Sequence, residues 1–256
     1  MHTNPPISPP LRFFDAVICD IDGCLGPESH DPVDALSLSS IAAYNRAAIS
    51  TGDRPIVTLC SGRPQPYVEA ICRVIGNNSL PCVAEMGVWL YDPANNGFIR
   101  DPNITPDDLR AVQEATRYIE RELVPKGLII QPGKTASISL WHPDTRSLMG
   151  LKPTLIETFA KNNWPLRVSS TVAWLNCDLA HISKATGIAR LLALTGLKKP
   201  RLAGIGDTIG DAAIREHVAF FACPSNAQEA LKPCADFVSA KPEIDGVLDI
   251  LERIRH

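Results

Sequence analysis

Residues 13–25 read FFDAVICDIDGCL, a mostly apolar run that ends in two aspartates and a glycine. The apolar run predicts a buried strand. Asp20 and Asp22 follow this strand directly, and in open α/β sheets ligands bind outside the carboxyl ends of the strands. The stretch therefore predicts a strand that carries two carboxylates to the edge of a sheet.

Strand-like and helix-like segments alternate at both ends of the chain, which indicates a parallel sheet covered by helices. Before the middle they are a helix over residues 33–50, a strand over 56–60, a helix over 64–75 and a strand over 81–84. After the middle they are helices over 188–194 and 208–216, strands over 201–205 and 218–222, a helix capped by SNAQ (225–228), and a strand and helix over 237–238 and 244–254.

The middle of the chain has a different pattern. Two short strand-like runs flank the turn sequence NNG (95–97), which predicts a hairpin. The other predicted segments are helices over 105–123 and 151–161 and strands over 136–141, 171–175 and 179–182. We therefore predict an α/β fold in which a Rossmann-like parallel-sheet core, residues 1–85 and 181–256, is interrupted by a smaller α+β domain, residues 86–180.

The composition fits a folded protein and disfavours several functions. Apolar residues make up 45% of the chain, which is enough for a sizeable core, and the net charge of −3 does not mark a nucleic-acid binder. The eight cysteines contain no CxxC pair, which favours reduced thiols over a disulfide framework. Residues 1–10 lack the features of a signal peptide, and no run is long enough to cross a membrane. We expect a cytoplasmic protein that binds neither nucleic acid nor a membrane, and its oligomeric state stays open.

The first chemical signal is DIDG, residues 20–23. Carboxylates at positions i and i+2 point to the same side of an extended chain. One can attack phosphorus while the other protonates the leaving oxygen. Gly23 allows a sharp backbone turn. A solvated acidic turn would have the same sequence, so the motif alone leaves both interpretations open.

Two shorter signals follow other predicted strands. Ser61 and Gly62 offer a hydroxyl and backbone N–H groups that can hold phosphate oxygens, although Ser-Gly is also common in ordinary loops. Lys184, at the start of a predicted helix, can neutralise phosphate and a nearby carboxylate, although most lysines are simply solvated.

The last signal is GIGDTIGD, residues 204–211. Asp207 follows a buried strand, Asp211 lies one helical turn further on, and hard carboxylate oxygens suit Mg²⁺. Thr208 as a helix cap would also explain the segment, and both interpretations can hold together. The glycine spacing is not GxGxxG and lies late in the chain, which argues against a dinucleotide-dependent enzyme.

Together and in this order, the signals resemble the four motifs of the haloacid dehalogenase superfamily of phosphohydrolases. The matching segments are DIDGCL (20–25), LCSGRP (59–64), Lys184 within HISKATGI (181–188), and Gly206-Asp207 with Asp211. The chain is most similar to the branch with a C2-type cap inserted between the second and third motifs, which includes the Cof-like, sucrose-phosphate and phosphoglycolate phosphatases. It departs from the pattern at three positions, with Cys24 for the more usual Thr and with Met86 and Gly210 for Asn.

The resemblance implies a role for each motif residue. Asp20 is expected to be the nucleophile and Asp22 the general acid/base. The other implied roles are Mg²⁺ binding by the Asp20 carboxylate, the Asp22 backbone carbonyl and Asp207, phosphoryl binding by Ser61, Gly62 and Lys184, and orientation of Lys184 or a metal-bound water by Asp211.

The implied function is a Mg²⁺-dependent phosphomonoesterase that hydrolyses a sugar phosphate or a phosphoglycolate-like metabolite through an aspartyl-phosphate intermediate. A phosphosugar mutase of the same superfamily would use the same aspartates, and a catalytically silent binding protein could share the fold without needing them. The middle domain would be a cap that closes over the site and selects the leaving group. Candidate selecting residues in it are Lys126, Lys134, Trp141, His142, Arg146, Lys152, Arg167, Trp174 and Asn176.

Overall fold

The computed structural model describes residues 12–28 and 30–255. Residues 1–10, in which no signal-peptide features were found, lie outside the described residues. Within the described part, no helix combines the length and the apolar character needed to cross a bilayer.

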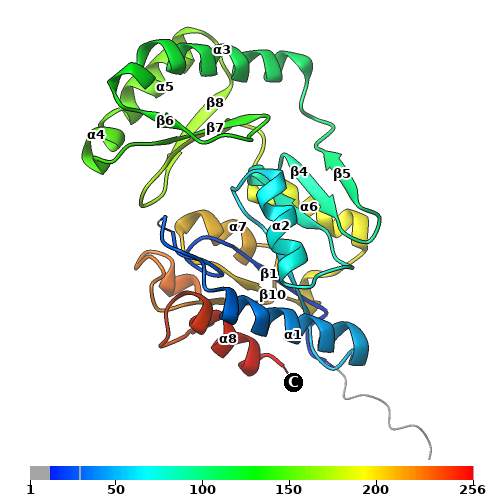
Figure 1. The fold of residues 1–256 in the computed structure, drawn as a ribbon. Coiled ribbons are helices and arrows are strands. Elements are labelled where there is room, and N and C mark those ends of the chain that lie inside the picture. The colour runs from blue at the N-terminus through cyan, green and yellow to red at the C-terminus, as the bar shows by residue number, and fades with distance from the viewer. Residues whose placement is uncertain (1–11, 29, 256) are drawn as a thin grey trace, which may run out of the picture.

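A five-stranded parallel sheet with the order β12-β11-β10-β1-β2 forms the larger of two bodies (Figure 1). Its strands are β1 (Ala16–Cys19), β2 (Ile56–Leu59), β10 (Leu202–Ile205), β11 (Phe220–Cys223) and β12 (Phe237–Val238). Cys19 pairs with both Ile205 and Leu59, so β1 and its two neighbours end level. The residues that follow these three strands therefore meet at one edge of the sheet.

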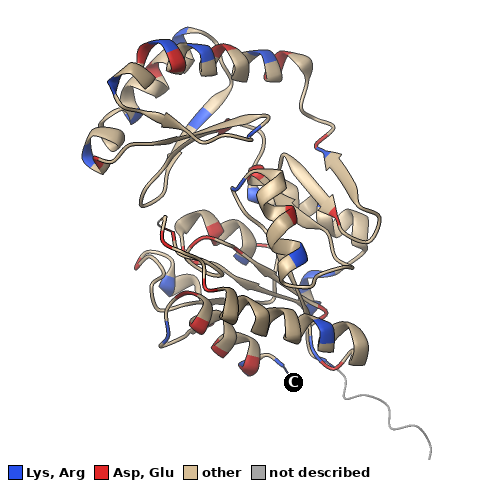
Figure 2. Cartoon of the chain, in the orientation of Figure 1, with Lys and Arg blue, Asp and Glu red and all other residues tan. Residues whose placement is uncertain are grey.

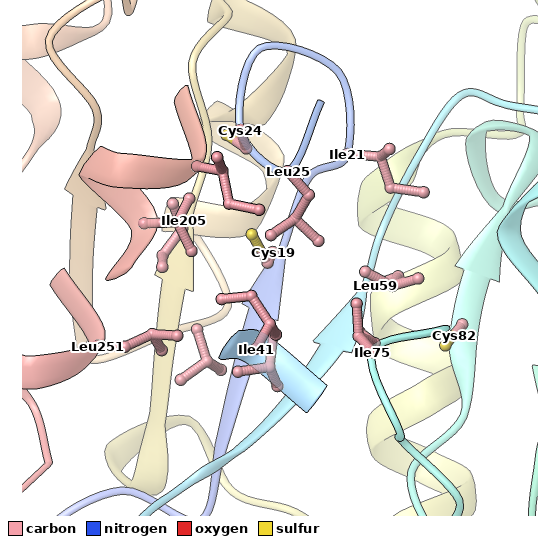
Figure 3. Packing of buried hydrophobic residues seen from close by; sticks show 14 of the residues in the cluster. Cys19, Ile21, Cys24, Leu25, Ile41, Leu59, Ile75, Cys82, Ile205 and Leu251 are labelled. Carbon is pink, nitrogen blue, oxygen red and sulfur yellow. The ribbon is translucent and has the colours of Figure 1, made fainter. Parts of the chain in front are cut away.

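Side chains alternate between the two faces of this sheet, as the period of a strand requires. Val17 and Cys19 point into one apolar cluster, and Ala16 and Ile18 point into another. The first cluster is covered by α1 (Ala35–Thr51), α2 (Gln65–Val74) and α8 (Glu243–Arg253), and the second by α6 (Lys184–Thr195) and α7 (Ala212–Arg215). Figure 3 shows the first cluster, where Cys19 and Ile205 of the sheet pack beside Ile41 and Leu251 of the helices.

A second, four-stranded antiparallel sheet with the order β6-β7-β9-β8 lies in the smaller body (Figure 1). Its strands are β6 (Ile129–Ile130), β7 (Ser137–Trp141), β8 (Leu166–Ser170) and β9 (Leu175–Leu179). One face packs its apolar residues on α3 (Pro106–Glu122) and α5 (Lys152–Lys161), and α4 (Thr145–Gly150) lies at one end. The opposite face is turned toward the larger body.

A third sheet joins the two bodies. It consists of β3 (Cys82–Ala84), β4 (Trp89–Asp92) and β5 (Gly97–Arg100), with β4 and β5 forming the predicted hairpin around NNG. A bridge between Cys60 and Val83 continues the parallel sheet into β3. In Figure 2, acidic and basic positions alternate along the outer helix α3, so this surface is mixed in sign.

The strands predicted over 171–175 and 179–182 are wrong. The two strands are β8 and β9, and residues 171–174 form the turn between them. The Thr171 N–H donates to the Trp174 carbonyl at 3.0 Å, and the Trp174 N–H donates to the Thr171 hydroxyl at 3.3 Å. This side-chain hydrogen bond stabilises a turn at residues whose composition favours a strand.

No α-helix follows SNAQ (225–228) in the described residues, which form turns and then a short 3₁₀ turn, Lys232–Cys234. The capping side chains are used elsewhere. Asn226 donates to the Gly23 carbonyl at 2.9 Å and accepts from the Glu243 N–H at 2.7 Å, while Gln228 accepts from the Ile209 N–H at 3.0 Å. Tertiary hydrogen bonds therefore replace the capping box.

Candidate active site

The site residues predicted from separate parts of the sequence meet at the carboxyl edge of the parallel sheet, where β1, β2 and β10 end side by side. The Asp20 N–H donates to the Ile205 carbonyl at 3.0 Å, and the Cys60 N–H donates to the Cys19 carbonyl at 2.9 Å, so these backbone contacts fix the loops to one another. Asp20, Lys184, Asp207 and Asp211 are each at most 5% exposed. Four charged residues buried together require mutual compensation.

Lys184 supplies part of that compensation. Its ammonium donates to Asp20 Oδ2 and to Asp211 Oδ1, both at 2.7 Å. Although burial alone would lower the pKa of Lys184, the carboxylates of Asp20 and Asp211 raise it well above its ordinary value. Ser183 caps α6 in a reciprocal capping box with Thr186, which fixes the backbone from which the lysine extends.

Asp211 orients this group rather than facing the cavity. Its Oδ1 accepts from Lys184, and its Oδ2 accepts from the Asp207 N–H at 3.1 Å, the Thr208 N–H at 3.0 Å and the Thr208 hydroxyl at 3.1 Å. Asp211 is fully buried and its oxygens are engaged by these donors. The helix predicted over 208–216 is correspondingly divided into a short 3₁₀ turn, Ile209–Asp211, and α7.

Asp20 and Asp207 have the donor chemistry of a divalent-cation site. Asp20, Asp207 and Asp211 each place a carboxylate oxygen within 4.8 Å of the others. Among the described residues, buried Asp207 Oδ1 has no hydrogen-bond partner. Burial, followed by repulsion from Asp20 and Asp211, raises the pKa of Asp207 to about 9. An oxygen-binding cation such as Mg²⁺ would relieve both the repulsion and the missing contact.

Gly23 makes room for the Asp207 side chain. Its φ is +72°, and a Cβ added there would lie 2.0 Å from Asp207 Oδ2. No described backbone group donates to the Asp22 carbonyl beside it, so this oxygen also fits a cation. Asp20, the Asp22 carbonyl and Asp207 thus fit the implied metal. Asp211 instead accepts the hydrogen bond from Lys184.

Asp22 is held by Arg63, whose part the sequence analysis missed. The Arg63 Nε lies 2.8 Å from Asp22 Oδ2, and its Nη2 lies 2.6 Å from Asp22 Oδ1. The Arg63 guanidinium stands 5.1 Å from the Tyr67 ring centroid and 5.9 Å from that of Trp174. A bidentate pair of this kind fixes the orientation of the carboxylate, and the Trp174 contact links it to the smaller body.

Ser61 and Gly62 lie where β2 leads into α2. Ser61 is fully buried, and its hydroxyl accepts from the Arg63 N–H at 3.1 Å. Gly62 lines the cavity, and a Cβ added to it would lie 3.3 Å from Met86 Sδ. Met86 therefore covers the turn with an apolar side chain.

A cavity of about 170 Å³ lies between the two bodies, bounded on one side by Asp20, Asp22 and Lys184. Of the candidate selecting residues, Lys134, Trp174 and Asn176 line it. Among the described residues, the candidates that do not line it are Lys126, Trp141, His142, Arg146, Lys152 and Arg167. Lining residues without a sequence signal of their own include Glu28, Gln131, Ser139 and Gln228.

Glu85 ties the two bodies together beside the cavity. It is fully buried and accepts from the Thr135 and Ala136 N–H groups at 2.7 Å each, and from the hydroxyls of Thr135 and Ser137 at 3.0 Å each. Glu85 and Met86 have positive φ values of 50° and 57°. Such values are uncommon for non-glycine residues, and the contacts of the buried Glu85 carboxylate hold this link in its bent form.

We expect Glu85→Ala to lower the free energy of unfolding by at least about 3 kcal/mol, because it leaves several donors without an acceptor. For a chain of this size that corresponds to a Tm lower by about 6–12 °C, measured by differential scanning calorimetry. Glu157→Ala, at an exposed position of α5, is the matched control. A loss no larger than that of the control would contradict the clamping role.

The chain is similar in sequence and fold to known hydrolases and phosphatases. The profile of the haloacid dehalogenase-like hydrolases matches residues 159–251. A phosphoglycolate phosphatase from Sulfolobus acidocaldarius is 33% identical over 93% of this chain and 95% of that protein. Phosphoglycolate phosphatase 1 from Saccharolobus solfataricus is 34% identical over a shorter stretch, 28% of this chain and 31% of that protein. The crystal structure of the sucrose-phosphatase from Synechocystis has the same fold, with a TM-score of 0.66, 16% identity and coverage of 95% and 98% of the two chains.

Proposed function

The chain belongs to the haloacid dehalogenase-like hydrolase family and is a phosphatase of that family; from this premise we propose that it hydrolyses a small phosphorylated metabolite with Mg²⁺ through a phosphate ester of Asp20. The observation that carries the proposal is the position of the Asp20 carboxylate, which lies 2.7 Å from Lys184, near Asp207 and on the wall of a cavity that also contains Asp22.

In the proposed first step, an Asp20 oxygen attacks phosphorus, the bond from phosphorus to the leaving oxygen breaks, and Asp22 donates a proton to that oxygen. In the second step, Asp22 accepts a proton from water as the water attacks phosphorus, and the bond from phosphorus to Asp20 breaks. Asp207, the Asp20 carboxylate and the Asp22 carbonyl would hold Mg²⁺, which when bound neutralises charge on the phosphoryl oxygens.

The remaining residues hold and orient the reacting groups. Lys184, Ser61 and Gly62 would bind the phosphoryl oxygens, and Asp211 keeps Lys184 in position through the 2.7 Å hydrogen bond. The bidentate contact from Arg63 fixes the orientation of the Asp22 carboxylate beside the cavity.

We also propose that residues 86–180 form a cap over a core of residues 1–85 and 181–256. The volume of about 170 Å³ is below the roughly 300 Å³ of the smallest pockets for drug-sized ligands, so a small metabolite fits. The named relatives favour 2-phosphoglycolate over a sugar phosphate. The eight cysteines are free thiols, which supports a cytoplasmic location.

Phosphate release from a panel of substrates tests the proposal. The panel contains 2-phosphoglycolate, several sugar phosphates and p-nitrophenyl phosphate, each with Mg²⁺ or with EDTA. Metal-dependent release is expected, with 2-phosphoglycolate preferred. A requirement for a sugar bisphosphate as activator would favour a mutase, and release that is equal in EDTA would contradict the metal site.

Mg²⁺ is expected to stabilise the fold most at high pH. The raised pKa of Asp207 means that the metal-free folded state binds more protons than the unfolded chain between about pH 4 and 9, so its stability falls as pH rises through this window. A cation at 100 times its Kd adds about 2.7 kcal/mol, or about 5–10 °C in Tm, and it competes with these protons. The shift in Tm on adding Mg²⁺ should therefore grow from pH 6 to pH 9.

Asp207→Asn provides the corresponding variant. In EDTA at pH 8 its Tm should exceed that of the wild type, because one of the three clustered carboxylates is removed, and Mg²⁺ should no longer shift it. Asp107→Asn, at an exposed position of α3, should keep the full shift. A full Mg²⁺ shift in Asp207→Asn would place the cation elsewhere.

A further inference from the structure

We propose that the cavity contains an anion subsite centred on Lys134, which selects substrates whose leaving group carries its own negative charge. The inference rests on the proposed phosphatase function and assigns the substrate class of that site. Two sources share the required chemistry: a carboxylate and a second phosphate group.

The subsite lies on the polar face of the four-stranded sheet. Ile138, Leu140 and Cys177 point into the apolar cluster beneath α3 and α5. The alternate residues Ser139 and Asn176, which are cross-strand partners, line the cavity on the other face. Because side chains alternate along a strand, this face presents hydroxyl and amide groups to the cavity, which Asp20 also lines.

Lys134 brings a positive charge to this polar face. It precedes β7, lines the cavity and donates a hydrogen bond to Ser139 Oγ at 2.5 Å, and the Ser139 hydroxyl donates in turn to Asn176 Oδ1. An ammonium group has three N–H donors. Ser139 accepts one, and no other described residue accepts a hydrogen bond from this ammonium. Two donors are available to a ligand in the cavity.

The surroundings leave this charge undersolvated. Burial lowers the pKa of Lys134, against the opposing effects of Asp178 and Glu85. Neither carboxylate accepts a hydrogen bond from the ammonium. Glu85 accepts four hydrogen bonds from residues 135–137, and among the described residues neither oxygen of buried Asp178 has a hydrogen-bond partner. An anion bonded to the free ammonium donors would restore interactions lost on burial.

The arrangement favours negative charge at both ends of the substrate. Lys184, with the Asp20 and Asp207 group, takes the phosphoryl end on one wall, and Lys134 lies on the wall formed by the smaller body. In a cavity of about 170 Å³ a short molecule can contact both. A phosphorylated hydroxy acid or a short bisphosphate has this form, whereas a neutral sugar leaving group would offer no anion to the free donors of Lys134.

The test compares kcat/KM of Lys134→Met on three substrates: 2-phosphoglycolate, a short bisphosphate, and p-nitrophenyl phosphate, whose leaving group carries no second anionic substituent. For whichever anionic substrate the wild type prefers, the variant should lose about 10- to 100-fold, mostly through KM, because one charge-assisted hydrogen bond is removed. Its kcat/KM on p-nitrophenyl phosphate should change by less than about 3-fold. Lys134→Arg should restore part of the loss.

Lys126→Met is the matched control, an exposed lysine of the same body that does not line the cavity, and it should leave all substrates unchanged. An equal loss on p-nitrophenyl phosphate and on the anionic substrates would overturn the subsite while leaving the phosphatase in place. The same would follow if the wild type did not prefer either anionic substrate. Failure of the wild type to hydrolyse all three would overturn the phosphatase and the subsite together.

Discussion

Asp20→Asn is expected to lower kcat by at least about 10⁴-fold, because the amide cannot attack phosphorus and no ester can form. The substitution keeps the size of the side chain and removes one of three clustered carboxylates. The variant should therefore remain folded, so loss of activity would report on the chemistry. Steady-state phosphate release under saturating Mg²⁺ measures the effect.

Asp107→Asn, which changes an exposed aspartate of α3, is the control for the same chemical substitution and should retain full activity. Circular dichroism and Tm should be recorded for both variants. Residual activity of Asp20→Asn above about 1% of the wild type would show that another group attacks phosphorus.

Lys184→Met is expected to lower the free energy of unfolding by about 3–5 kcal/mol at pH 8 in EDTA, because it leaves Asp20 and Asp211 buried without their counter-ion. The corresponding fall in Tm is about 6–20 °C. The loss should shrink as pH falls from 9 to 6. Burial and carboxylate repulsion raise the pKa values of Asp20 and Asp207. At lower pH the folded variant therefore takes up protons that neutralise these carboxylates, and the free energy of unfolding of the variant rises.

Lys161→Met, an exposed lysine of α5, is the matched control and should keep a Tm close to that of the wild type over the same pH range. Differential scanning calorimetry at several pH values gives both profiles. A Lys184→Met profile that is parallel to the wild-type profile would contradict the view that this lysine compensates the carboxylates.

The core strands and the convergence of the motif residues could be predicted from the sequence because both depend on local signals. Apolar runs mark β1, β2 and β10, and parallel strands that end level bring the residues after them to one edge. Asp20 and Asp207 are therefore neighbours although they are far apart in the chain. The chemical roles of these residues stay predictions that the variants above test.

Contacts between distant segments could not be predicted in the same way. Arg63 reaches Asp22 only because the loops after β1 and β2 lie side by side, and Glu85 reaches residues 135–137 only because the smaller body folds back over the link. In the sequence, Lys134 does not differ from a solvated surface lysine. Only its position beside the polar face of the four-stranded sheet indicates a binding role.

The errors in secondary structure have a related cause. Thr171 and Val172 favour strands, but the hydrogen bonds between Thr171 and Trp174 stabilise a turn. In SNAQ, Asn226 and Gln228 have the composition of a helix cap, yet their side chains bond to Gly23, Glu243 and Ile209. Polar side chains with partners outside their own segment override local preference, and such partners are not visible in a local window of sequence.

The central claim is that phosphate passes through a covalent bond to Asp20. Rapid acid quenching during turnover of ³²P-labelled substrate tests it most directly, since an aspartyl phosphate survives acid and is released by hydroxylamine. The account predicts that the wild-type protein carries transient, hydroxylamine-labile label on the peptide containing Asp20, and that Asp20→Asn carries none. Label on the same peptide in Asp20→Asn, or turnover by the wild type with no label on the protein at any quench time, would contradict it.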